Sequence, residues 1–173
     1  GVELIAASRT TGSQEIILAT KSGKSVRFEE TDVRPMGRSA MGVRGITLAD
    51  EDVVVGMEIL SPDNTILSVT QNGFGKRSPL DDYRIQKRGG MGIITIRTSE
   101  RNGPVIGVAQ EREDDHVMLI TDGGKVLRCP VSGISTMGRA TQGVTLMDLA
   151  EGEKVVAVAR FAESDVAGSG GDA

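Results

Sequence analysis

The residues with the strongest chemical character in this sequence form a cationic, glycine-rich turn, Gln86-Lys87-Arg88-Gly89-Gly90-Met91-Gly92. Glycine permits positive φ angles and lets a large partner approach the main chain closely. Exposed backbone N–H groups and the side chains of Lys87 and Arg88 both complement an anion. The turn therefore indicates a contact with phosphate, and the alternative interpretation is a solvated hairpin turn.

The same residue types recur at a fixed distance along the chain. Gly42, Gly92 and Gly143 each begin a strand-like segment, and they are 50 and 51 residues apart. Two sets of arginines keep this spacing: Arg27, Arg77 and Arg128 form one set, and Arg38, Arg88 and Arg139 form the other. Threefold internal similarity with a period of about 50 residues is typical of stacked or radial repeat folds.

Each repeat is expected to form four short strands. In the second repeat the apolar and β-branched segments are 65–70, 76–79, 92–97 and 105–110. The corresponding segments are 16–20, 25–28, 43–48 and 53–60 in the first repeat and 117–121, 126–129, 144–147 and 155–161 in the third. No long window has a convincing 3.6-residue apolar period, so helices are not indicated. We predict an all-β fold of propeller-like repeats, with four-stranded blades of about 50 residues.

The spacing of the repeats also predicts how the chain divides. We expect one repeat domain over residues 1–163, with blades at about 15–64, 65–115 and 116–163. Residues 1–14 include a strand-like segment, 2–7, that we assign to a preceding blade. Residues 164–173 are rich in glycine and acidic, and we expect a flexible tail there. Because the chain does not begin with Met and enters strand-like sequence almost at once, we interpret it as a piece of a longer protein.

The composition narrows the class of protein. Cys129 is the single cysteine, so an intrachain disulfide is excluded and a cytosolic protein is favoured. Neither a signal peptide nor an apolar run of about 18 residues is present, so secretion and membrane insertion are not indicated. The chain has no Trp, one Tyr and three Phe, so Val, Ile and Leu are expected to fill the core.

Enzymatic chemistry is not indicated by the residues. Gly23-Lys24-Ser25 resembles the end of a phosphate-binding P-loop, but Leu18 stands where that motif requires glycine. His116 and Cys129 are the only residues of their types, so a zinc site or a Cys–His nucleophile pair lacks ligands. Tyr83 has no nearby base or metal ligand in the sequence, and we expect it to pack over the turn.

Acidic and basic residues are segregated by their position within each repeat. The net charge is −4, yet segments 21–48, 76–101 and 125–147 carry +3, +4 and +3, and the remainder carries −14. If the repeats are arranged radially, the basic segments form a band along one side, as in proteins that contact a nucleic-acid backbone. The alternative interpretation is that charged loops keep a β-protein in solution.

Several motifs, in the right order, resemble the C-terminal domain of bacterial DNA gyrase A. They are Val33–Arg38, Gly42–Ile46, Thr70–Arg77, Thr98–Gly103 and Ser135–Val144, and the similarity extends from about Glu3 to Glu163. The resemblance implies the last three of six blades of a β-pinwheel, in which neighbouring blades exchange strands and duplex DNA wraps around a basic rim. Gln86–Gly92 is similar to the glycine-rich box of that family, but Lys87 and Met91 depart from it, and the box belongs in the first blade. Its special role is therefore not transferred to this turn.

The resemblance implies a DNA-binding and DNA-wrapping module of a type IIA topoisomerase that supports ATP-dependent negative supercoiling, with no catalytic residue, metal or cofactor in this segment. The implied partners are double-stranded DNA, mainly its phosphate backbone, the upstream domains of gyrase A and, through the holoenzyme, gyrase B. The implied location is the bacterial cytoplasm, in association with the nucleoid. No membrane partner is implied. The expected DNA contacts are Arg38, Arg88, Arg139, Lys87, Lys76, Arg77, Arg27, Arg128, Arg44, Lys24, Lys125 and Arg97. The alternatives are the C-terminal domain of topoisomerase IV and a propeller-type scaffold for protein interactions. We expect the recurrence of arginine in every blade to favour DNA binding over the scaffold.

Overall fold

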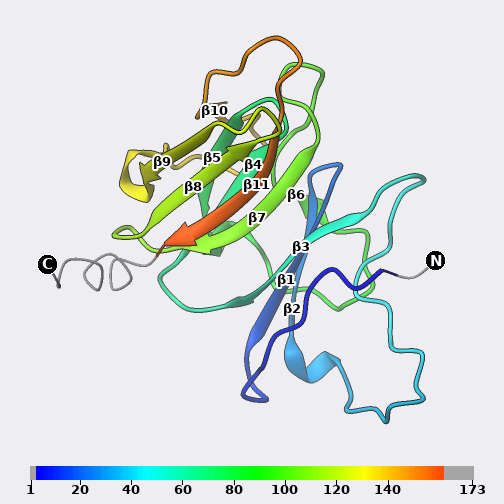
Figure 1. Cartoon of the computed structure of the whole chain (residues 1–173). Helices are drawn as coiled ribbons and strands as arrows, with labels where there is room; N and C mark the ends of the chain where they lie inside the picture. Colours follow the sequence, from blue (N-terminus) through cyan, green and yellow to red (C-terminus); the bar gives the residue numbers. More distant parts are fainter. Residues whose placement is uncertain (1–2, 162–173) are drawn as a thin grey trace, which may run out of the picture.

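The computed structural model describes residues 3–161, which form three small antiparallel β-sheets (Figure 1). Each sheet is built on a hairpin: β1 (Glu15–Thr20) with β2 (Lys24–Glu29), β4 (Thr65–Thr70) with β5 (Phe74–Pro79), and β8 (His116–Thr121) with β9 (Val126–Pro130). A longer strand then pairs with the first strand of each hairpin, namely β3 (Val54–Leu60), β7 (Val105–Glu111) and β11 (Val155–Phe161). Short 3-10 turns follow the hairpins: η1 (Glu30–Asp32), η2 (Leu80–Asp82) and η3 (Val131–Gly133). The predicted all-β repeat fold is confirmed.

The hairpin turns explain why threonine and glycine recur together. Gly23, Gly73 and Gly124 have φ angles of 87°, 81° and 80°, a region that residues with a Cβ seldom adopt. The threonine that ends the first strand supports the turn: the backbone N–H of Lys24 donates to Thr20 Oγ1 at 3.3 Å, and that of Lys125 donates to Thr121 Oγ1 at 3.1 Å.

The fourth strand of a sheet comes from the next repeat. β6 (Ile93–Ile94) pairs with β2, and β10 (Val144–Thr145) pairs with β5. The strand orders are therefore β3-β1-β2-β6 and β10-β5-β4-β7, while the third sheet, β11-β8-β9, has three strands among the residues that the structure describes. The second and third repeats thus each contribute to two sheets, in agreement with the strand exchange that the resemblance implied.

Two expected strands are not formed. Residues 43–48 of the first repeat correspond to β6 and β10, which pair with the hairpin of the preceding repeat. They are not in a strand, because no hairpin precedes the first repeat in the described part of the chain. Residues 3–14 are likewise outside any strand, in contrast to the expectation for 2–7. The predicted tail, 164–173, lies outside the described residues.

Aliphatic side chains fill the spaces between sheets, as the composition predicts. Ile17, Ile66 and Ile96 pack between the first and second sheets. A second cluster, with Leu67 and Leu119 among its members, joins the second and third sheets. Tyr83 is also in the core, with its hydroxyl oxygen 2.7 Å from Thr95 Oγ1, so its expected packing role is confirmed. No helix among the described residues is long and apolar enough to cross a membrane.

The two edges of each sheet differ in their surroundings. β3 packs against β7, and β7 packs against β11, so these three strands form a common inner edge. β6 and β10 lie at the opposite, outer edge of their sheets. The turns that lead into the exchanged strands are therefore carried on the outer edges.

A buried carboxyl group lies at the inner edge. Glu111 ends β7, is 0% exposed, and neither of its carboxyl oxygens has a hydrogen-bond partner within the described residues. Burial raises the pKa of Glu111 to about 8; Arg160 opposes the shift, and the carboxylates of Asp115 and Glu58 add to it. The group is therefore mainly protonated at neutral pH in the folded protein.

We expect the free energy of unfolding to fall as the pH rises from about 4.5 to about 8. The folded-state pKa of Glu111 lies above its ordinary value of 4.5, so its contribution is complete below pH 4.5 and is lost as the pH approaches 8. One such group lowers the free energy of unfolding by at most about 1.4 kcal/mol per pH unit. Urea unfolding at pH 5.5 and 7.5 measures this, and Glu111→Gln is expected to remove most of the difference. The exposed control Glu100→Gln should retain it, and an unchanged slope in Glu111→Gln would contradict the prediction.

Candidate nucleic-acid interface

The cationic turn 86–92 lies against the segment 44–47 of the preceding repeat. The backbone N–H of Thr47 donates to the carbonyl oxygen of Gly90 at 2.8 Å, and its hydroxyl donates to that of Gly89 at 2.6 Å. The N–H of Gly89 in turn donates to the carbonyl oxygen of Gly45. The turn is therefore held as part of the junction between repeats.

Three cations gather at this first junction. Arg88 donates through Nε to the carbonyl oxygen of Asp32 at 2.8 Å and through Nη1 to that of Arg44 at 3.2 Å. Lys87 lies beside it with a side chain 91% exposed, 3.2 Å from the carboxylate of Asp32. An ion pair this exposed holds its partners weakly. Lys87 and the exposed side chain of Arg44 are thus available to an anion from solution.

The second junction repeats this arrangement. Arg139 donates through Nε to the carbonyl oxygen of Asp82 at 2.7 Å and through Nη1 to that of Ile94. The backbone N–H of Arg97 donates to the carbonyl oxygen of Thr141 at 2.9 Å, which leaves the exposed Arg97 side chain beside the turn of the next repeat. Each junction therefore has one arginine bound to the preceding repeat and at least one exposed cation next to it.

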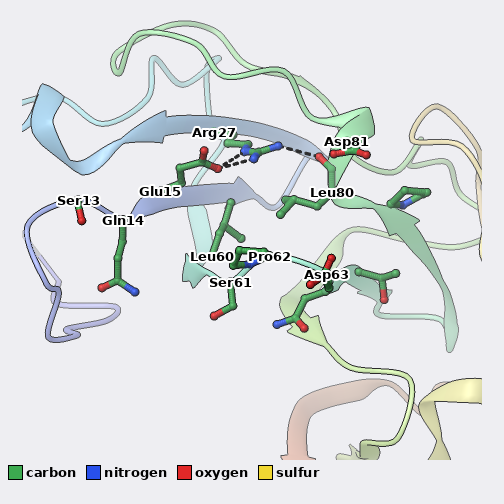
Figure 2. A pocket seen from close by; sticks show the side chains of 13 residues that line it. Ser13, Gln14, Glu15, Arg27, Leu60, Ser61, Pro62, Asp63, Leu80 and Asp81 are labelled. Carbon is green, nitrogen blue, oxygen red and sulfur yellow. Dashed lines mark hydrogen bonds and ion pairs between the residues drawn. The ribbon is translucent and has the colours of Figure 1, made fainter.

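The other recurring arginines reach in the opposite direction along the chain. Arg27 donates through Nη1 to the carbonyl oxygen of Leu80 at 2.9 Å and through Nε to Glu15 at 2.6 Å (Figure 2). Its Nη1 also donates to the carbonyl oxygen of Tyr83 at 2.8 Å. Its side chain is 13% exposed. Arg77 similarly donates through Nε to the carbonyl oxygen of Ile134 at 2.9 Å. These side chains bind each sheet to the repeat that follows it.

Lys76 and Arg77 require a correction, because the sequence led us to expect phosphate contacts there. Lys76 is 0% exposed and its ammonium group donates to the carbonyl oxygens of Gly138 and Arg139. Burial, and to a lesser extent the charge of Arg139, lower the pKa of Lys76 to about 8. Arg77 is 5% exposed and is also paired with Glu113. Neither side chain can reach DNA while these contacts persist, so both have structural roles.

The structural role of the recurring arginines also removes a distinction that we drew from the sequence. A propeller-type scaffold needs its repeats joined as much as a DNA-binding module does. Recurrence of arginine in every repeat therefore does not separate the two functions. Only the cations that remain exposed are accessible to an anion from solution.

Most of the other expected contacts are on the surface. Lys24, Arg38, Arg44, Arg97 and Arg128 are exposed, and none has an ion pair among the described residues. Lys125 differs because it is paired with Glu153 at 3.1 Å. The pKa of Glu153 is lowered to about 2, mainly by the hydrogen bond from Thr121, so this partner remains charged. Lys125 accordingly contributes less net positive charge than its repeat equivalent Lys24.

A cavity next to the first two sheets does not suit a phosphate group. Its volume is about 640 Å³, and it is lined by Glu15, Asp63 and Asp81 and by one cation, Arg27 (Figure 2). Carboxylates outnumber cations there, and the cation is already paired with Glu15. The candidate interface is therefore the outer surface of the junctions.

The remaining candidates for chemistry have structural surroundings. Cys129 is half-buried on β9, and burial raises the pKa of its thiol, which disfavours the reactive thiolate. His116 begins β8. No group of three or more His, Cys, Asp or Glu residues that could hold a metal ion occurs within residues 3–161.

The fold and the exposed cations define a propeller-type repeat protein whose blades exchange strands. The chain belongs to the family described as "DNA gyrase C-terminal domain, beta-propeller", whose model matches residues 14–61, 64–110 and 115–162. These three matches correspond to the three hairpin-based repeats of the structure.

The similar proteins include DNA gyrase A of Salmonella typhimurium, 50% identical over 163 residues. DNA gyrase A of Staphylococcus epidermidis is 42% identical over 165 residues. In both comparisons 94% of this chain is covered, but only 19% and 18% of the relative. The chain therefore spans about a fifth of the length of these curated relatives.

Two solved structures have the same fold. One is a DNA gyrase A C-terminal domain, with a TM-score of 0.81, 27% identity, and coverage of 87% of this chain and 51% of that chain. The other is the C-terminal domain of DNA topoisomerase IV, with a TM-score of 0.82, 27% identity, and coverage of 87% and 47%. The TM-scores to the two solved structures are thus nearly equal. The sequence identities to the two gyrase A relatives named above are higher than those to either solved structure.

We expect Arg77→Met to destabilise the protein by about 1 to 3 kcal/mol, because it leaves the buried carbonyl oxygen of Ile134 without a donor and removes the ion pair of the buried guanidinium with the exposed Glu113. Arg128→Met changes the equivalent residue of the third repeat, which is exposed, and should cost less than about 0.5 kcal/mol. Urea unfolding of both variants at low protein concentration measures the difference. Equal losses would show that the contact between repeats does not stabilise the fold.

Proposed function

We propose that this chain is a non-catalytic DNA-binding module that bends duplex DNA along the outer edges of its sheets. The observation that supports this most directly is the pair of junctions at which exposed cations recur: Arg44 and Lys87 at the first, and Arg97 at the second. Cations carried on successive blades neutralise phosphates each time a bent duplex returns to the surface.

The distribution of charge supports the outer edges of the sheets as the side that binds DNA. The three basic segments include all or most of the second strand of each hairpin, and two of them contain the exchanged strands β6 and β10 at the outer edge. Exposed carboxylates outside these segments, Asp50, Glu51 and Asp114 among them, lie in turns. A polyanion is attracted to the outer edge and repelled by acidic segments elsewhere, which orients it on approach.

Binding is expected to follow the shape of DNA more than its sequence. The only helical elements among the described residues are three 3-10 turns of three residues each, so a recognition helix for the major groove is not available there. Bending 20 to 30 base pairs costs roughly 1 to 6 kcal/mol, which several charge-assisted phosphate contacts offset.

Within the set of expected DNA contacts, the structure favours Lys24, Arg38, Arg44, Lys87, Arg97 and Arg128. Arg88 and Arg139 keep N–H groups beyond the two donors that bind the preceding repeat, since a guanidinium has five. Arg27 and Lys125 are paired with carboxylates, and Lys76 and Arg77 are buried, so we assign these four to the fold.

In the parent protein we propose that this module acts within gyrase A, in the bacterial cytoplasm, and with gyrase B in the holoenzyme. Wrapping would set the direction in which DNA crosses itself before strand passage by other domains, in support of ATP-dependent negative supercoiling. Identities of 42 to 50% to gyrase A relatives favour this assignment over topoisomerase IV. We assign no cofactor to this segment.

The combined variant Arg44→Gln, Lys87→Gln and Arg97→Gln should weaken binding to a mixed-sequence duplex of about 40 base pairs. Each lost phosphate contact should reduce the slope of log affinity against log salt by about 0.9, or by about 2.7 for all three. Fluorescence anisotropy across a salt series measures both quantities. Circular dichroism should be unchanged, because none of the three side chains makes a hydrogen bond within a sheet.

The matched control removes the same charge outside the basic segments, by Arg9→Gln, Arg112→Gln and Lys154→Gln. It should leave the salt slope nearly unchanged. Equal effects of the two triple variants would mean that binding reflects net charge alone, and wild-type protein that fails to bind even at low salt would exclude DNA binding by this chain.

A further inference from the structure

One large apolar side chain of the cationic turn 86–92 is directed into solvent. Met91 is 73% exposed, and the same turn carries Lys87, whose side chain is 91% exposed. The strand that follows the turn, β6, is paired with β2 of the preceding repeat. The exposure of Met91 is therefore a property of a completed junction between two repeats.

The main chain on both sides of Met91 is held in place. On one side, the carbonyl oxygen of Gly90 accepts a hydrogen bond from the backbone N–H of Thr47 at 2.8 Å. On the other side, Gly92 has a φ of 75°, and a Cβ placed on it would lie 2.6 Å from the carbonyl oxygen of Ser25. These two contacts fix the point from which the Met91 side chain leaves the surface.

Packing within the protein does not explain an apolar residue at this position. Met91 belongs to none of the three apolar clusters among the described residues. The equivalent residue of the third repeat is Gln142, so a junction forms as well with a polar side chain there. Single exposed apolar residues are common on proteins, but Met91 lies on a fixed backbone beside the cations that the proposed function assigns to DNA.

An apolar side chain can make a contact with duplex DNA that a cation cannot. Lys87 and Arg44 attract phosphates, whereas the faces of the stacked bases are apolar. Met is one of the residues that enter the minor groove, insert between base pairs and kink the duplex. Its side chain is unbranched and polarisable, so it adapts to a narrow gap. The exposed cations beside Met91 can hold the DNA backbone while the side chain inserts.

The geometry of bent DNA determines which groove the side chain meets. When a duplex wraps around a protein, its minor groove faces the protein about once every 10 base pairs. Pyrimidine–purine steps such as TA and CA are the most easily unstacked. A side chain that inserts from the protein surface therefore enters the minor groove, and its insertion costs least at these steps.

We propose that Met91 enters the minor groove and partly unstacks one base step where the duplex crosses the first junction. This inference rests on the proposed function, because it requires duplex DNA along the outer edges of the sheets. Lys87 holds a phosphate beside the resulting kink. The insertion gives the module a preference for deformable TA and CA steps without any hydrogen bond to a base edge.

The fluorescence of 2-aminopurine tests the unstacking directly, because this base is quenched within the stack and becomes brighter when it is unstacked. A duplex of about 40 base pairs carries it at TA steps about 10 base pairs apart. Binding of the 173-residue wild-type chain should raise the fluorescence. Met91→Leu should retain the rise, because the side chain stays apolar. Met91→Gln should lose it and should bind this duplex about fivefold to tenfold more weakly, because the apolar contact is lost.

Two controls separate this contact from the phosphate contacts and from folding. Met91→Gln removes no charge, so its slope of log affinity against log salt should equal that of wild type. It also introduces the residue type that the third repeat already has at this position, and its circular dichroism should be unchanged. Gln142→Ala is the matched variant at the second junction, and it should retain the rise in fluorescence.

The outcomes distinguish failure of this inference from failure of the proposed function. A wild-type chain that does not bind the duplex even at low salt overturns both. A wild-type chain that binds with a steep salt dependence but without a rise in fluorescence overturns only the insertion of Met91. The same conclusion follows if Met91→Gln retains the rise, or if Gln142→Ala loses it to the same extent as Met91→Gln.

Discussion

Hydrogen bonds from arginine guanidinium groups to backbone carbonyls of the adjacent repeat hold this structure together. A sheet of three or four short strands buries too little apolar surface to be stable alone, so each depends on its neighbour. Arg27 and Arg77 reach forward along the chain, and Arg88 and Arg139 reach back. A guanidinium suits both tasks, since it remains charged and presents donors in a rigid fork. The exchanged strand then completes each sheet from the side of the next repeat.

This use of arginine divides the basic residues of the chain into two groups. Some are hydrogen-bonded within the junctions: Lys76 is fully buried there, and Arg77 is nearly so. Others remain on the surface beside the same junctions, as Lys87 and Arg97 do. The exposed cations do not occupy one repeat position: Lys87 corresponds to Gly37 and Gly138, and Arg97 corresponds to Thr47 and Asp148. What the two junctions share is an arginine that binds the preceding repeat with at least one exposed cation beside it, and this feature relates the architecture to the proposed wrapping of DNA.

The glycines show how closely the backbones approach at these junctions. At Gly73 and Gly92 another backbone occupies the space that a side chain would need, and at Gly42 and Gly124 the same conformation is retained with that space empty. The buried carboxyl group of Glu111 is a separate feature of the fold. It lies at the inner edge, remains protonated near neutral pH, and makes stability depend on pH without any contact to the cationic surface.

The repeat, its period, the hairpins and the apolar core were predictable from the sequence, because glycine turns and alternating β-branched segments act locally. Segregation of charge within each repeat was also visible there, as was the family, through motifs such as Thr70–Arg77. Only the tertiary structure decided which cations are exposed: Lys76 and Lys87 both stand beside turns, but a strand places the first in a junction and a loop places the second in solvent. It likewise decided that segment 43–48 forms no strand and that the carboxyl of Glu111 is buried. These properties depend on contacts between residues some 50 positions apart, and local sequence does not specify them.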